Sequence, residues 1–262
     1  MRKFGVRRVA GDIVHDMTTT DEYIATTYGD QLADVYDQWF GAYEDAAIDT
    51  LANLAQGGPA LELGVGTGRI ALPLAAKGLK VSGIDASTAM VSKLRARPGG
   101  GSIAVTMGNF ADVAVEGEFS LVFVVFNTFY ALLIQEEQVR CFRNVARHLM
   151  KGGSFVIEAF VPDVARFSGG QSVRAYTVTD ERVSLQVAQH DPLQQRMKSQ
   201  NIVFINSEVR LYPVEIRYAW PSELDLMAQL AGLQLRHRWG NWNQEEFNPR
   251  DEKHISVYQR LE

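Results

Sequence analysis

Cysteine is nearly absent from this sequence of 262 residues, and Cys141 is its only example. A single cysteine excludes a disulfide within the chain and a metal cluster built from several thiolates. Cys141 falls in a stretch whose apolar residues have helical spacing, so we expect a packed thiol without a chemical role. No histidine forms a closely spaced pair with another histidine or with cysteine, and we expect no metal site. The five are His15, His148, His190, His237 and His254.

Long apolar runs and blocks of basic residues are also missing. Even the longest apolar runs, such as 121–126, are far shorter than the ~18 residues that span a bilayer. Segment 1–8 is basic but lacks the apolar stretch of a secretory signal. We therefore expect a cytoplasmic protein with no membrane partner. The net charge is −5, from 26 basic and 31 acidic residues, and without clustered lysine and arginine we expect no nucleic-acid partner.

What is present is the composition of an ordinary globular protein, with 46 % hydrophobic and 22 % charged residues. The length fits one large α/β domain, or one domain with an elaboration, and it can bury a sizeable core. Between about positions 60 and 160, strand and helix patterns alternate. Such alternation is typical of a parallel sheet with helices on both faces.

The most informative stretch is 61–69, Leu-Glu-Leu-Gly-Val-Gly-Thr-Gly-Arg. It has the pattern of a strand end, a glycine turn and a helix start. The glycines at alternate positions, Gly64, Gly66 and Gly68, let the main chain approach a ligand where a Cβ would collide. Amides at the start of the following helix are free donors with positive partial charge. The stretch therefore predicts a docking site for a small anionic or zwitterionic group.

Asp85 follows the next expected strand, 80–84, and stands 21 positions after Gly64. Strand, glycine loop, helix, strand and then an acid is the order that places a carboxylate at the hydroxyl groups of a ribose. The two carboxylate oxygens can accept both O–H donors. A plain surface aspartate at a strand end is the alternative. A glycine loop alone is a weak signal, so the identity of the ligand depends on its neighbours.

The string from Glu62 to Arg69, Glu-Leu-Gly-x-Gly-Thr-Gly-Arg, resembles the first motif of class I S-adenosylmethionine (SAM) methyltransferases. A dinucleotide fingerprint would need glycine or alanine at position 69 instead. The resemblance extends to about position 160 and includes the run Ala-Arg-His-Leu-Met-Lys-Gly-Gly-Ser-Phe-Val-Ile-Glu at 146–158. It implies a Rossmann-like sheet, SAM as the cofactor, and cofactor contacts from the three glycines and Arg69.

Further cofactor residues follow from the same resemblance. Ala86 and Met90, just after the acid, are expected against the adenine ring. Asn109, followed by Phe110, stands where the family more usually has an aspartate after a glycine. We expect its amide oxygen to accept a hydrogen bond from the adenine amino group, with the charge lost but the role kept.

A dense aromatic group precedes the glycine turn, on expected helices 21–28, 31–40 and 44–55. It forms either a packing face or a lid over the cofactor, because a sulfonium favours aromatic neighbours by cation–π attraction. In the family that this chain resembles, a tyrosine of such a Tyr-Asp segment commonly meets SAM, so Tyr36 is the first candidate and Tyr28 the second. The group comprises Tyr23, Tyr28, Tyr36, Trp39, Phe40 and Tyr43.

Residues after the expected strand 119–126 stand at the sheet edge where ligands bind in parallel α/β proteins. Asn127 is expected to bond the amino-acid end of SAM, and Phe129 and Tyr130 to shape the reacting centre. Tyr130 and Glu158 are the candidates for a catalytic general base. A positioning or purely structural role is the alternative for both.

We therefore expect an α/β protein with a doubly wound, Rossmann-like sheet of five parallel strands plus an antiparallel pair at the C-terminus. An N-terminal arm and helical lid would occupy 1–57, the SAM-binding core 58–166, an antiparallel β insertion 167–220, and a return to the core sheet 221–262. The insertion is predicted from alternating segments 174–178, 182–189, 197–205 and 209–218, joined by turn-forming residues.

These features predict an enzyme that moves a methyl group from SAM, by in-line displacement, to a nitrogen or oxygen atom of a small molecule or natural-product intermediate. An amine acceptor does not require a general base, whereas a hydroxyl acceptor usually does. Two alternatives stay open: an NAD-type oxidoreductase, which Arg69 and Glu62 disfavour, and a non-catalytic SAM-binding or protein-docking module. The exposed edges of the insertion are suited to pairing in a homodimer.

Overall fold

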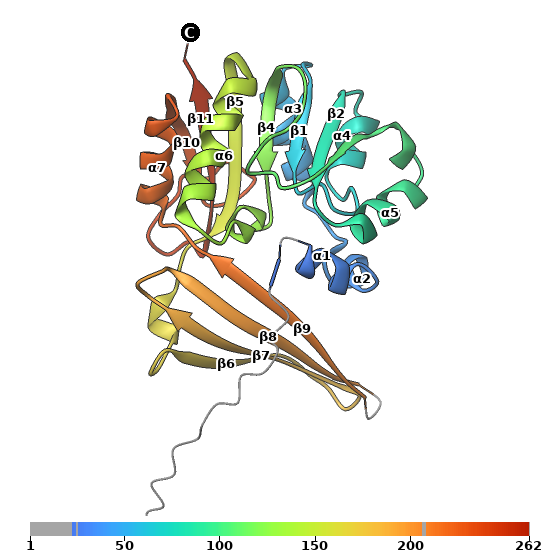
Figure 1. Ribbon diagram of the computed structural model, residues 1–262, viewed down its shortest axis with the longest axis vertical. Helices are drawn as coiled ribbons and strands as arrows, with labels where there is room; N and C mark the ends of the chain where they lie inside the picture. The colour runs from blue at the N-terminus through green and yellow to red at the C-terminus, as the bar shows by residue number, and fades with distance from the viewer. Residues whose placement is uncertain (1–22, 25, 206–207, 262) are drawn as a thin grey trace, which may run out of the picture.

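The computed structural model describes residues 23–24, 26–205 and 208–261. Positions 1–22 and 25 of the expected N-terminal arm and helical lid lie outside this part of the chain. Two sheets organise the described residues: a seven-stranded sheet of order β10-β11-β5-β4-β1-β2-β3 and a four-stranded sheet of order β6-β7-β8-β9 (Figure 1). Strands β1 to β5 of the large sheet are parallel to one another, and β11 runs antiparallel to both of its neighbours. The expected fold class is confirmed.

The strands of the large sheet are short at its parallel end and longer at its antiparallel edge. They are β1 (Ala60–Leu63), β2 (Val81–Asp85), β3 (Ala104–Met107), β4 (Phe119–Val124), β5 (Leu149–Phe160), β10 (Leu233–Trp239) and β11 (Lys253–Arg260). The connecting elements are α3 (Asp45–Ala55), α4 (Ala71–Ala76), α5 (Thr88–Ala96), η1 (Gly100–Ser102), η2 (Thr128–Ala131), α6 (Gln135–His148), η3 (Val164–Arg166) and α7 (Pro221–Leu230).

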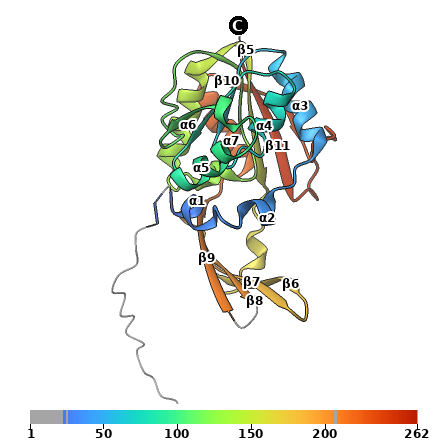
Figure 2. The ribbon, with the colours of Figure 1, turned by 90° about the vertical axis from the view of Figure 1, so that its right-hand side faces the viewer.

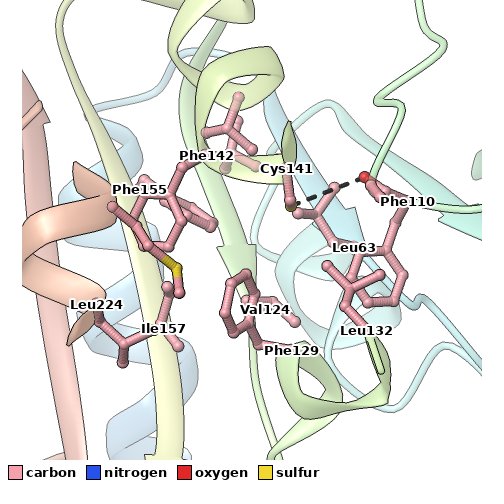
Figure 3. Close-up of a cluster of buried hydrophobic side chains, with 14 of the residues drawn as sticks. Leu63, Phe110, Val124, Phe129, Leu132, Cys141, Phe142, Phe155, Ile157 and Leu224 are labelled. Atoms are coloured by element: carbon pink, nitrogen blue, oxygen red, sulfur yellow. Dashed lines mark hydrogen bonds between the residues drawn. The ribbon is translucent and has the colours of Figure 1, made fainter. Parts of the chain in front are cut away.

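Helices cover both faces of the large sheet because its central strands send apolar side chains to both sides. Along β4, Leu121 and Phe123 pack with α3 and α4, whereas Val122 and Val124 pack with α6 and α7. Figure 3 shows part of the second cluster, in which the Phe142 ring of α6 makes an edge contact with Phe155, their centroids 5.1 Å apart. None of the helices in the described part of the chain combines the length and apolar character needed to cross a bilayer.

Cys141 lies in this same cluster and is fully buried, as expected for a packed thiol. Its sulfur lies 3.8 Å from the carbonyl oxygen of Phe110 (Figure 3). Burial raises the pKa of the Cys141 thiol. The thiol is therefore held in its protonated, unreactive form.

The β insertion is a meander of four antiparallel strands with two unlike faces. Its strands are β6 (Gln171–Val178), β7 (Arg182–Asp191), β8 (Arg196–Ile205) and β9 (Glu208–Arg217). The inner face packs on the N-terminal helices α1 (Thr27–Leu32) and α2 (Tyr36–Phe40), with Tyr212 buried against Leu32 and Trp39. Figures 1 and 2 show α1 and α2 lying between the two sheets. The short helices are thereby held at the edge of the large sheet.

The N-terminal helices differ from the prediction, which ended a helix at position 28 and began another at 31. In the structure α1 runs through Gly29 and Asp30. A Cβ at Gly29 would stand 2.5 Å from the Cβ of Ser87, so the glycine lets α1 pack directly on the start of α5. A tertiary contact, which sequence propensity does not include, accounts for this glycine.

Candidate active site

The glycine turn between β1 and α4 has the backbone that the sequence predicts. Gly64, Gly66 and Gly68 have φ values of 74°, 52° and 77°, in the left-handed region that favours glycine. Space is short as well: a Cβ on Gly64 would stand 2.5 Å from the Cγ2 of Thr128, and one on Gly68 would collide with Leu94. Any other residue at Gly64 would therefore fill the cavity edge or displace its wall.

Asp85 at the end of β2 is bonded to this turn. One carboxylate oxygen accepts from the backbone amide of Gly66 at 2.7 Å, and the other accepts from the amide of Ser87 at 2.8 Å. Burial raises the pKa of Asp85, and these amides partly offset that effect. Each oxygen keeps a further lone-pair site, so the carboxylate can still accept from the two hydroxyl groups of a ribose.

A cavity of about 330 Å³ opens at the carboxyl edge of the parallel strands, beside the N-terminal segment. A second cavity, of about 20 Å³, shares Tyr36, Gly64, Gly66 and Thr128 with it and also reaches Glu62 and Arg69. The large cavity gathers most of the residues predicted to bind a cofactor. These are Tyr28, Tyr36, Gly64, Gly66, Asp85, Ala86, Met90, Asn109 and Phe110.

Glu62 is a buried carboxyl at the floor of the small cavity, and it was not among the predicted site residues. Its Oε2 atom has no hydrogen-bond partner among the described residues. Burial raises the pKa of Glu62 well above its ordinary value, although the nearby Arg69 opposes the shift. A buried acceptor without a donor fits the ammonium group of an amino acid, which supplies both the proton and the charge. The residues here therefore suit a zwitterionic tail such as that of SAM.

Arg69 links the glycine turn to the N-terminal helices. Its guanidinium donates to the carbonyl oxygen of Phe40, and its Cζ lies 3.1 Å from the ring centroid of Phe126. The Tyr36 ring lies further off, with its centroid 5.7 Å from Cζ. A second link joins the same elements, since the Thr67 hydroxyl donates to the Asp37 carboxylate at 2.7 Å. The helices are thus fastened over the cofactor side of the cavity.

Three tyrosines of the N-terminal segment line the large cavity: Tyr23, Tyr28 and Tyr36. The rings of Tyr28 and Tyr36 meet edge to face, with centroids 6.5 Å apart. Burial raises the pKa of all three hydroxyl groups, so each is a neutral donor and acceptor at neutral pH. The sequence identified Tyr23 in the aromatic group but did not place it in the site.

Asn109 lines the cavity, but not with the hydrogen bonds that were expected. Its amide oxygen accepts from the backbone amide of Ala111 at 2.9 Å, an Asx turn after β3. Its amide nitrogen donates to the Oε1 atom of Glu137 at 3.2 Å. Glu137, in the first turn of α6, also lines the cavity, and no sequence signal pointed to it.

The structure does not bring Gly68, Asn127, Tyr130 or Glu158 to the lining of either cavity. The Tyr130 hydroxyl is buried between two backbone carbonyls, 2.9 Å from that of Ala219 and 3.1 Å from that of Phe160. Because the hydroxyl is buried and bonded to the backbone, this geometry favours the purely structural alternative for Tyr130. The cause is the turn η2 after β4, which sends Tyr130 into the core and Thr128 into the cavity.

Glu158 and Asn127 likewise hold the scaffold. The Glu158 carboxylate accepts from the Trp242 indole and from the Phe126 amide, both at 3.1 Å, and pairs with Lys253 at 3.0 Å. With these donors in place, the position favours the structural alternative over a general base. Asn127 is exposed and lines neither cavity, and its side-chain oxygen accepts from the Phe160 amide at 2.7 Å.

Known proteins resemble this chain over its core and beyond. A family model described as a methyltransferase domain matches residues 60–153. The CcbJ methyltransferase from Streptomyces caelestis is 40 % identical, with a TM-score of 0.84, and the match covers 92 % of this chain and 100 % of that chain. The cypemycin N-terminal methyltransferase of a Streptomyces species is 27 % identical over 201 residues, which is 76 % of this chain and 82 % of that protein.

A more distant structure shows the same fold. SAM-bound CalS10 from Micromonospora echinaspora, an amino pentose methyltransferase involved in calicheamicin biosynthesis, is 20 % identical with a TM-score of 0.65. The match covers 93 % of this chain and all of that chain.

Proposed function

This chain belongs to the class I SAM-dependent methyltransferases and uses SAM as its cofactor, and we propose that it methylates an amine nitrogen of a small molecule or natural-product intermediate. The methyl group would transfer by in-line displacement, and a hydroxyl oxygen is the alternative acceptor. The observation that carries the proposal is the continuous cavity that joins the glycine turn and Asp85 to three tyrosines of the N-terminal segment.

The residues that line the large cavity and the small one beside it can hold SAM. Glu62 would take the ammonium group, Asp85 the ribose hydroxyls, and Ala86 and Met90 one side of the adenine. When bound, SAM supplies a methyl group on a positively charged sulfur. The protein's contribution is then alignment of donor and acceptor, which is worth up to ~7 to 11 kcal/mol in the best intramolecular reactions.

The acceptor side is formed by the tyrosines. Their ring faces favour a positive charge, and their neutral hydroxyl groups can accept from an amine or donate to other polar groups of the acceptor. Because Tyr23 and Tyr28 precede the core sheet in sequence, the N-terminal segment would supply acceptor contacts as well as cover the cofactor. Thr128 and Leu132 line the opposite wall.

Nitrogen is favoured over oxygen because each of the two acids among the described residues that line the cavity, Asp85 and Glu137, already accepts hydrogen bonds, and these residues include no other strong base. Among the described residues that line it there is no histidine, lysine or cysteine. Asp85 is hydrogen-bonded to Gly66 and Ser87, and Glu137 to Asn109. An amine loses its proton readily to water, whereas a hydroxyl usually needs a base in contact with it. The names of the cypemycin N-terminal and amino pentose enzymes agree with a nitrogen acceptor.

The two alternatives from sequence are not favoured. A non-catalytic module would be expected to have its acceptor region filled by side chains, whereas an open cavity lies there. Arg69 and Glu62 at the glycine turn disfavour an NAD-type oxidoreductase, whose fingerprint has glycine or alanine at position 69. The expectations of a cytoplasmic location and of no nucleic-acid or membrane partner stay predictions.

Paired acceptors test the proposal directly. The protein is incubated with methyl-labelled SAM and pairs of small molecules that differ only in an amine or a hydroxyl group, and mass gain is measured. We expect gain on the amine members. Gain on the hydroxyl members alone would assign an O-methyltransferase. Binding of S-adenosylhomocysteine (SAH) without methylation of any pair would contradict the acceptor class and leave the cofactor assignment standing.

The outer face of the β insertion supports a homodimer, as a separate part of the proposal. Pairing across the strands puts Leu185, Ile202 and Leu211 in one apolar row. A parallel row holds Val178, Val183, Phe204 and Val209, and four members of the two rows are exposed. An isologous contact needs a surface that complements itself, and the apolar patch formed by these two rows meets that need. A second copy of the chain is therefore the proposed occupant.

A further inference from the structure

We propose that Glu137 recognises the 6-amino group of the cofactor's adenine. It would do so in place of the aspartate that the family more usually has at position 109. The inference deepens the cofactor site, and it rests on the proposed function only for the presence of SAM in the cavity. The two residues come from different elements, Asn109 from the loop after β3 and Glu137 from the start of α6.

The hydrogen bonds of Asn109 carry the first step. Because the backbone amide of Ala111 donates to the side-chain oxygen, the amide group of Asn109 is held in one orientation. That oxygen already accepts one hydrogen bond, and the amide nitrogen has two N–H donors and no acceptor capacity. The 6-amino group of adenine is itself a donor, so this nitrogen cannot satisfy it. A carboxylate from another residue would be the stronger acceptor for this amino group.

Glu137, whose carboxylate contacts the side chain of Asn109, supplies that acceptor. Its Oε1 atom accepts from the Asn109 nitrogen at 3.2 Å and from Arg140 at 3.4 Å. Its side chain is 23 % exposed and lines the large cavity, and no described residue donates to its Oε2 atom. A carboxylate fixed through one oxygen and free at the other is suited to accept from an amino group.

The surroundings match a purine. The residues expected against the adenine ring, Ala86 and Met90, line the same cavity as Glu137. Phe110 and Leu132 add apolar surface, as flat heterocycles require. Glu137 also lies in the first turn of a fourteen-residue helix, where the helix dipole stabilises a negative charge. An acid lost from the loop after β3 is thus replaced by one from a neighbouring helix.

The test compares two ligands that differ at the 6-position of the purine. SAH carries the amino group, and S-inosylhomocysteine carries an oxo group, which is an acceptor and would face the carboxylate unfavourably. Their dissociation constants are measured by calorimetry on the full chain. We expect the wild type to prefer SAH at least about tenfold, since a hydrogen bond to a charged group is worth about one to two orders of magnitude in affinity.

Glu137→Ala is expected to remove most of that preference. Glu137→Gln, whose amide can present either an acceptor or a donor, should bind the two ligands about equally. Glu136→Ala is the matched control, because this acid lies in the same helical turn but not on the cavity lining. Asn109→Asp combined with Glu137→Ala should restore the preference, since it returns an acid to position 109.

A structural role for Glu137 would weaken both ligands by the same factor and leave their ratio unchanged. An unchanged ratio in folded Glu137→Gln therefore overturns the proposal. Failure of the wild type to bind either ligand is a different result, because it would contradict the cofactor site and with it the proposed function. If Glu137→Ala does not fold, the isosteric Glu137→Gln variant decides the question alone.

Discussion

The carboxylate of Asp85 accepts a hydrogen bond from the backbone amide of Gly66 at 2.7 Å, so the acid after β2 and the glycine turn after β1 form one unit. This bond fixes the turn before any cofactor enters. It also leaves Asp85 with free lone-pair sites that point to a role in binding the ribose. Pre-organisation of this kind lowers the entropy cost of binding.

Replacing Asp85 should therefore separate binding from folding. Asp85→Asn exchanges one acceptor oxygen for a donor nitrogen, which opposes the ribose hydroxyls and the Ser87 amide. We expect the affinity for SAH to fall about 10- to 100-fold in calorimetry while the variant stays folded. Asp49→Asn, which changes an exposed acid paired with Lys77, serves as the control and should bind normally. Normal SAH affinity in Asp85→Asn would remove this residue from the site.

Glu62 predicts a pH dependence of cofactor binding. Burial raises the pKa of Glu62 well above the ordinary 4.5, so in the free protein this carboxyl keeps its proton to a higher pH than an ordinary glutamate does. Binding of the ammonium group requires the charged carboxylate, so this proton is released on binding. Affinity for SAH should therefore rise with pH through the raised pKa of the free protein and then level off. Calorimetry in buffers of different ionisation enthalpy should detect proton release, and Glu62→Gln should abolish it. 5′-Methylthioadenosine, which lacks the amino-acid tail, should show no such release.

The raised pKa of Glu62 also makes the stability of the ligand-free protein depend on pH, in the opposite direction: the affinity for SAH rises with pH, whereas the stability falls. A carboxyl whose folded pKa is raised contributes stability below its ordinary pKa and loses that contribution as the pH rises through the folded value. Glu62→Gln should thus be more stable than the wild type at high pH in the absence of ligand. If Glu62→Gln were less stable than the wild type over the whole pH range, the Glu62 carboxyl would have a stabilising partner beyond the hydrogen bonds described above.

Tyr130 should matter for stability and not for turnover. Tyr130→Phe leaves the buried carbonyl of Ala219 without its donor, at a cost of about 1 to 3 kcal/mol in the free energy of unfolding. We expect kcat to stay within about twofold of the wild-type value, since a residue outside the site contributes no transition-state contact. Denaturant unfolding and steady-state kinetics check the two parts. A large loss of kcat at unchanged stability would reinstate the catalytic role.

The apolar outer face of the insertion predicts the oligomeric state. Light scattering coupled to size exclusion should give a dimer for the wild type and a monomer for Leu211→Lys, because a charge buried in a desolvated contact is costly. Leu193→Lys is the matched control: this leucine is 94 % exposed in the turn between β7 and β8, outside the apolar rows. A monomeric wild type, or a dimer that survives Leu211→Lys, would contradict the proposed contact.

Sequence by itself determined the features that depend on local pattern. The apolar run of β4 required cover on both faces, the alternate glycines required a turn with left-handed angles, and the position of Asp85 followed from the strand that carries it. Each of these depends on periodicity or on backbone conformation within a few residues. The four strands of the insertion were predictable for the same reason.

Tertiary structure alone decided which side chains face the cavity. A single short turn after β4 exchanged the expected Asn127 and Tyr130 for Thr128. Glu137 contacts Asn109 across 28 positions of sequence, and the Oε2 atom of Glu62 is buried with no partner among the residues that the structure describes. Such outcomes depend on where separate elements meet in space, and no local pattern of residues encodes the rotation of one element against another.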